Sequence, residues 1–173
     1  MAVPSNTEND LSAAAMRGDR RAFEGLVKLH QASVRAVARR LCGSASEGDD
    51  IAQAAFLTAW RRRESWRGGS FRGWVCTIAY REFLHARRKR SFELEADELA
   101  DPVSDAPDQR MDILRAFSEL EPNERAAAAL CLGAGLSHAE AAIVMHAPLG
   151  TVKSWVARGR TKLQAALSAY ATV

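Results

Sequence analysis

The stretch G-L-S-H-A-E-A-A-I-V-M-H-A-P-L-G-T-V-K-S-W-V-A-R-G-R-T-K-L, residues 135–163, predicts two helices joined by a tight corner. Ser137 and Glu140 have the spacing of a capping box, which opens a short helix ending near Met145. Pro148 separates the two helices, because proline disfavours helical geometry in the residue before it and fits a helix's first turn. A short helix, a tight turn and a longer helix form the plan of a helix-turn-helix, whose second helix enters the major groove of DNA.

The second helix of this stretch separates apolar from polar side chains. Apolar residues recur near a 3.6-residue period and predict a buried stripe. That stripe consists of Val152, Val156, Leu163 and Leu167. The polar residues that fall off the stripe are Lys153, Ser154, Arg158 and Thr161. A cationic outer face favours DNA binding, and an ordinary helical hairpin with solvated cations is the alternative on this stretch alone.

Composition limits the class of protein. The chain has 173 residues, of which 47% are hydrophobic, and no apolar run approaches the roughly 18–20 residues that span a bilayer. The polar N-terminus lacks an apolar signal segment, so we expect a cytoplasmic protein without membrane insertion. Cys42, Cys76 and Cys131 lie far apart and outside any metal-ligand spacing, which predicts buried free thiols and no metal site. We expect no cofactor.

The net charge of +3 conceals a strong asymmetry along the chain. Residues 1–90 hold 17 basic and 9 acidic side chains, whereas residues 91–112 hold 1 basic and 8 acidic ones. A basic block, an acidic tract with prolines and a second, weakly basic block predict two domains and a linker. We therefore expect an all-α protein with two small helical domains joined by a flexible acidic linker. The expected boundaries are 1–92, 93–110 and 111–173.

The first domain contains a helix whose outer face is unusual for a solvated surface. In E-G-D-D-I-A-Q-A-A-F-L-T-A-W-R-R-R, residues 47–63, Asp50, Gln53, Ala54 and Leu57 share one face at i, i+3, i+4, i+7 spacing. A carboxylate, an amide and a leucine on one face suit a protein partner. A half-exposed surface helix is the alternative.

A glycine-rich loop and a basic helix follow. Trp66 lies beside two glycines and an arginine, and the helix predicted at 71–90 carries Trp74 inward and Tyr80 among many cations. Aromatic rings interleaved with arginines offer stacking surfaces and phosphate contacts, the chemistry used to hold unpaired bases. Trp66 is the better candidate for a base contact, since Trp74 is expected in the core.

Together these segments resemble the extracytoplasmic-function sigma factors of the sigma-70 family. The resemblance is carried by D-D-I-A-Q-A-A-F-L-T-A-W (49–60), S-W-R-G-G-S-F-R-G-W (65–74), L-E-P-N-E-R (120–125), G-L-S-H-A-E-A-A (135–142) and P-L-G-T-V-K-S (148–154), in family order. It implies a transcription initiation factor that binds core RNA polymerase and promoter DNA, both as duplex and as melted strand. It also implies control by an anti-sigma factor.

The resemblance and the residue patterns give three predicted sets of site residues. The polymerase-binding set is Asp50, Gln53 and Leu57. The set for the minus-ten element is Ser65, Trp66, Arg67, Gly68, Tyr80, Arg81, His85 and Arg88. The set for the minus-thirty-five element is Thr151, Lys153, Ser154, Trp155 and Arg158.

Four positions depart from the family's usual residues. Ala54 replaces a glutamate, Arg81 and His85 replace an asparagine and an aspartate, and Trp155 replaces an arginine. These departures favour an alternative, a sigma-like decoy that binds an anti-sigma factor without engaging promoters. The complete P-L-G-T-V-K-S segment favours promoter binding, which a decoy does not need. No paired carboxylates, phosphate-binding loop or nucleophilic triad supports a third class, an enzyme acting on nucleic acid.

Overall fold

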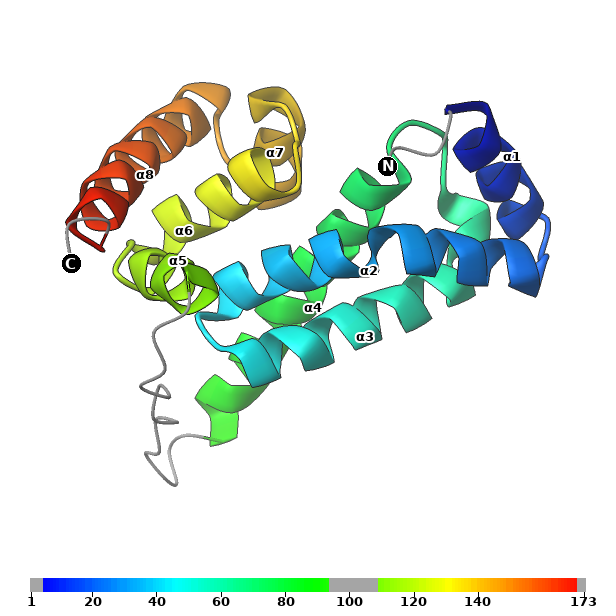
Figure 1. Ribbon diagram of the computed structural model, residues 1–173, viewed down its shortest axis with the longest axis horizontal. Helices are drawn as coiled ribbons and strands as arrows, with labels where there is room; N and C mark the ends of the chain where they lie inside the picture. Colours follow the sequence, from blue (N-terminus) through cyan, green and yellow to red (C-terminus); the bar gives the residue numbers. More distant parts are fainter. Residues whose placement is uncertain (1–4, 94–108, 171–173) are drawn as a thin grey trace.

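The computed structural model describes residues 5–93 and 109–170, and every regular element within those ranges is a helix (Figure 1). The expected all-α fold with two helical domains is confirmed. The predicted linker, 93–110, falls largely outside the described residues. Among the helices described, none is both long and apolar enough to cross a membrane.

The first domain is a bundle of three long helices with a short helix at one end. Its elements are α1 (Ser5–Met16), α2 (Arg20–Cys42), α3 (Ala45–Arg61), the single 3-10 turn η1 (Arg63–Ser65) and α4 (Phe71–Glu93). The Asp19 carboxylate caps α2 by accepting hydrogen bonds from the backbone N–H groups of Arg21 and Ala22 at 2.9 and 3.1 Å. Gly43 ends α2 with φ of 70°, a left-handed conformation that glycine adopts without strain. The resulting sharp reversal lays α3 along α2, and α4 packs against both.

The second domain contains the predicted helix-turn-helix. Its elements are α5 (Gln109–Ser118), α6 (Pro122–Ala128), the π-helical turn η2 (Ala129–Gly133), α7 (His138–Met145) and α8 (Leu149–Tyr170). Ser137 and Glu140 form the predicted capping box, because each side chain accepts a hydrogen bond from the other residue's backbone N–H. Val152, Val156 and Leu163 are buried as predicted, whereas Leu167, the last residue of the predicted stripe, is exposed.

The corner of the helix-turn-helix requires a left-handed residue, and His146 occupies that position with φ of 50°. A side chain in this conformation brings its Cβ close to the following carbonyl, which costs roughly 1–2 kcal/mol for most residues. We expect His146→Gly to raise the free energy of unfolding of the second domain by about 0.5–1 kcal/mol. Urea titration followed by circular dichroism measures this change.

His138→Gly is the matched control, because His138 begins α7 in ordinary helical geometry. Glycine there should lower stability by its poorer helix propensity, up to about 1 kcal/mol. A loss of stability in both variants would contradict the assigned strain at the corner.

The two domains contact each other. The C-terminal half of α2 lies against α5 and η2, which Figure 1 shows at the left-hand end of the first bundle. The guanidinium of Arg40 stands over the ring of Phe117, 5.6 Å from its centroid. Burial lowers the pKa of Arg40. The second domain therefore packs against the C-terminal half of α2. We call this the closed arrangement of the two domains.

The three cysteines are free thiols, but the predicted burial holds for only one of them. Cys76 is buried, and Cys42 and Cys131 are half-buried. Burial raises the pKa of both Cys42 and Cys76 to about 12, which keeps these thiols protonated and unreactive at neutral pH.

Candidate protein and nucleic-acid interfaces

Two adjacent carboxylates at the start of α3 have different roles. Asp49 accepts two hydrogen bonds from Arg35, at 3.1 and 2.9 Å, and two from Arg39, both at 2.8 Å. These hydrogen bonds, first those of Arg39, hold the pKa of Asp49 well below its usual range. Asp49 therefore links α3 to α2, and both of its carboxylate oxygens already accept hydrogen bonds within the protein.

Asp50 is exposed, and in the described part of the chain its carboxylate makes no hydrogen bond or ion pair. Gln53 is also exposed and equally without a side-chain partner within those residues, and Leu57 is 53% exposed. The three side chains follow one face of α3 at the predicted spacing. An exposed stripe of this composition is available to a partner.

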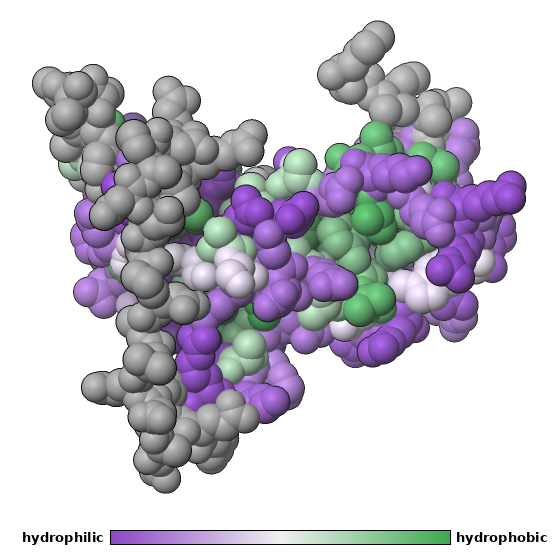
Figure 2. Space-filling model, turned by 60° about the horizontal axis from the view of Figure 1, so that its bottom comes forward, coloured by the Kyte–Doolittle hydropathy of each residue, from purple (hydrophilic) through white to green (hydrophobic). Residues whose placement is uncertain are grey.

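An apolar groove borders this stripe, between α2 and α3. It has a volume of about 750 Å³, and it is lined by the stripe together with Phe23, Val27, Phe56 and Trp60. Apolar side chains gather over these two helices in Figure 2. The groove could not be predicted from the sequence, because its walls come from two helices whose mutual rotation is set by packing.

The glycine-rich loop presents the predicted residues for the melted strand. Ser65, Arg67 and Gly68 are exposed, and Gly68 and Gly69 adopt φ of 93° and 82° with open space around them. Trp66 is half-buried, and its indole Nε1 is buried without a hydrogen-bond partner among the described residues. The loop therefore presents glycine backbone with open space around it, next to the partly exposed ring of Trp66.

Three residues of the predicted basic face of α4, Arg81, His85 and Arg88, are exposed. The expected outward position of Tyr80 is wrong: this residue is 6% exposed, and its ring lies 6.4 Å from that of Phe83. Burial raises the pKa of Tyr80. The reason is that α4 packs against both α2 and α3, so its buried surface is wider than one stripe. Tyr80 is unavailable to DNA in this arrangement.

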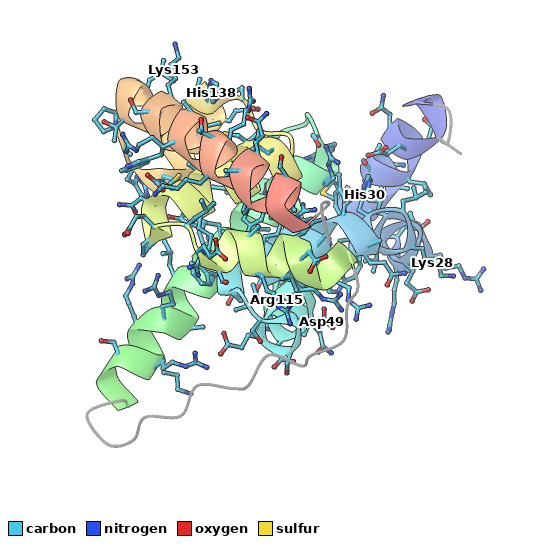
Figure 3. The ribbon with its side chains drawn as sticks, turned by 60° about the vertical axis from the view of Figure 1, so that its left-hand side comes forward. Lys28, His30, Asp49, Arg115, His138 and Lys153 are labelled. Carbon is cyan, nitrogen blue, oxygen red and sulfur yellow. The ribbon has the colours of Figure 1, made fainter. Side chains whose placement is uncertain are left out.

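The outer face of α8 carries the predicted upstream-element residues. Lys153 and Ser154 are exposed, Thr151 and Trp155 are half-buried, and Trp155 packs against the core. Figure 3 shows Lys153 extending away from the body of the protein. Arg158 is exposed, but its Nε donates a hydrogen bond of 2.9 Å to Glu124 on α6, a contact that the sequence does not predict.

Comparison with known proteins identifies the fold that carries these surfaces. Residues 26–93 match Sigma-70 region 2, and residues 110–163 match Sigma-70, region 4. The chain is 31% identical to the ECF RNA polymerase sigma factor SigE of Mycolicibacterium smegmatis, over 93% of this chain and 68% of that protein. The chain belongs to the extracytoplasmic-function sigma factors of the sigma-70 family.

Further relatives of this sigma factor agree. It is 30% identical to the RNA polymerase sigma-H factor of Pseudomonas aeruginosa, over 92% of this chain and 93% of that protein. Its fold matches the sigma factor RpoE of Bartonella quintana, solved in complex with the anti-sigma factor NepR, with a TM-score of 0.74. That comparison covers 84% of this chain and 96% of the other, at 28% identity.

Proposed function

We propose that this sigma factor docks on core RNA polymerase through the exposed stripe Asp50, Gln53 and Leu57 and the adjoining apolar groove. The observation that carries the proposal is the contrast between Asp49 and Asp50. One carboxylate is held by two arginines, and its neighbour is exposed with no side-chain partner in the described residues. A polar group left free beside an apolar groove matches the composition of protein interfaces, where an apolar centre has a polar rim.

The promoter contacts belong to two separate surfaces. In the second domain, α8 reads the upstream element in the major groove through Thr151, Lys153, Ser154, Trp155 and Arg158. In the first domain, Trp66 and the exposed cations of α4 hold the opened downstream strand by stacking and by phosphate contacts. The protein itself performs no reaction, and it acts in the cytoplasm, together with the polymerase.

Simultaneous use of both surfaces requires the closed arrangement to open. Elements at minus ten and minus thirty-five lie about 85 Å apart along B-DNA, at 3.4 Å for each base pair. In contrast, α2 has 23 residues and is about 35 Å long, and the second domain packs against its C-terminal half. We therefore propose that the contact of α5 and η2 with α2 separates when the protein engages a promoter.

An anti-sigma factor is the proposed regulator. RpoE of Bartonella quintana, whose fold this chain shares, was solved in complex with such a protein. A regulator that covers the α2–α3 groove would exclude the polymerase, because both would need the same exposed apolar surface.

Run-off transcription with core polymerase on a library of randomised promoters tests the proposal. We expect specific transcripts only when this protein is added to the core enzyme. The enriched templates should share two sequence blocks, one for each domain. If the protein fails to bind core enzyme at low salt, with no anti-sigma factor present, it is not a working sigma factor. A decoy that binds an anti-sigma factor would then be the better explanation.

A further inference from the structure

A buried carboxylate lies beneath the proposed DNA-reading helix. Glu124 belongs to the first turn of α6, and its side chain is only 6% exposed. Both of its oxygens face α8, where Oε1 accepts a hydrogen bond of 2.9 Å from Arg158 Nε and Oε2 accepts one of 2.7 Å from Lys162 Nζ. A buried carboxylate is stabilised by such partners, because burial alone strongly disfavours the charge.

The hydrogen bonds around Glu124 favour its ionised form. The hydrogen bond from Lys162 lowers the pKa of Glu124, burial opposes this effect, and the hydrogen bond from Arg158 lowers the pKa further. Glu124 is therefore ionised at neutral pH and accepts from both cations. The two cations are four residues apart on α8, so one carboxylate can reach both on the same flank of the helix.

The contact leaves the recognition edge of Arg158 available. Only Nε donates to Glu124, and the side chain remains 56% exposed. The terminal Nη1 and Nη2 atoms, which give arginine its two-point contact with guanine, make no hydrogen bond within the described residues. Arg158 also follows the exposed Ser154 by one helical turn, so it lies on the outer part of α8.

We infer that Glu124 is a positioning residue that holds the Arg158 guanidinium in the orientation that reads a promoter base. The inference rests on the proposed function of α8 as the upstream-element reader. A free arginine side chain loses much conformational entropy when DNA immobilises it. A side chain that Glu124 already holds loses less, so the fixed orientation strengthens the contact with the correct base.

A purely structural role for Glu124 is the competing explanation. In that case the two ion pairs would only fasten α8 to α6, and their loss would weaken folding without changing which bases are read. The two roles differ in one measurable quantity, the base preference at a single upstream position. The downstream element, read by the first domain, provides an internal reference.

The test uses the full chain with core polymerase on the randomised promoter library. Glu124→Met keeps the side-chain length but removes both acceptors. We expect it to reduce the preference at one upstream position about ten-fold, within the range for losing a two-point arginine contact. Arg158→Ala should reduce the same preference to a similar extent, and the double variant should be no worse than Arg158→Ala alone. Downstream preferences should stay unchanged in all three.

Two further variants separate positioning from folding. Glu124→Gln keeps an oxygen that accepts from Arg158 Nε, so it should restore most of the preference. Arg160→Ala is the matched control, because Arg160 is an exposed cation of α8 that has no ion pair within the described residues. It should weaken binding to all templates alike.

The inference is overturned if Glu124→Met retains the parent's upstream preference, or if its effect adds to that of Arg158→Ala. Should Glu124→Met fail to fold by circular dichroism, Glu124→Ala, which also removes both acceptors, replaces it under the same criteria. A reduced upstream preference that does not add to the effect of Arg158→Ala supports positioning, and a retained preference or an additive effect overturns it. If the unmodified protein directs no transcription, the proposed function fails instead, and that result is distinct.

Discussion

Replacing both Asp50 and Gln53 by alanine should weaken binding to core RNA polymerase by about 100-fold and abolish promoter-directed transcription. Interface residues of this kind contribute about 1–2 kcal/mol each when truncated, and two such losses correspond to roughly that factor. Both side chains are exposed and make no side-chain hydrogen bond or ion pair in the described ranges, so the fold should be unaffected. Fluorescence anisotropy of the labelled protein with core enzyme measures the affinity.

The matched control is the double variant Asp10→Ala and Gln164→Ala. These two residues are an exposed aspartate on α1 and an exposed glutamine on α8, away from the α3 stripe. The control should bind polymerase like the unmodified protein, and both double variants should melt at the parent's temperature. If the double variant Asp50→Ala, Gln53→Ala binds core polymerase with unchanged affinity, the α3 stripe is not part of the interface.

The structure explains why the sequence alone could not separate Asp49 from Asp50. Their local contexts are nearly the same, two acids in the first turns of one helix. What distinguishes them is the position of Arg35 and Arg39 on the preceding helix. Contacts between helices depend on how the helices rotate against each other, which sequence periodicity does not specify. For the same reason, the sequence does not predict the hydrogen bond between Arg158 and Glu124, which are 34 residues apart.

Local signals, in contrast, predicted local structure well. The capping box at Ser137 and the break at Pro148 placed α7 and the start of α8 correctly, because both depend on residues within one turn. Tyr80 shows where such reasoning fails. A single 3.6-residue stripe assumes one packing partner, but α4 has two, and the wider buried surface includes Tyr80.

The tight contact of Gly48 on α3 with the backbone of Arg39 on α2 gives the largest stability effect that we expect. A Cβ at Gly48 would lie 2.4 Å from Arg39 Cα and 2.5 Å from Arg39 N, both backbone atoms that cannot move without the helix. Gly48→Ala therefore forces the helices apart and disturbs the adjacent hydrogen bonds of Asp49. We expect a loss of about 3 kcal/mol in the free energy of unfolding, typical of severe overpacking. In a chain of this size that loss lowers the melting temperature by about 10 °C.

Gly25→Ala is the control for this prediction, since Gly25 also lies inside a long helix. A Cβ there would meet only the two methyl groups of Leu11, both at 3.5 Å, an ordinary contact. Alanine should thus stabilise α2 by up to about 1 kcal/mol through its better helix propensity. The same substitution is expected to act in opposite directions at the two glycines, and differential scanning calorimetry measures both. A Gly48→Ala protein as stable as Gly25→Ala would contradict the tight helix contact. Because Asp50 lies two residues beyond Gly48, that contact also fixes the position of the α3 stripe proposed to meet the polymerase.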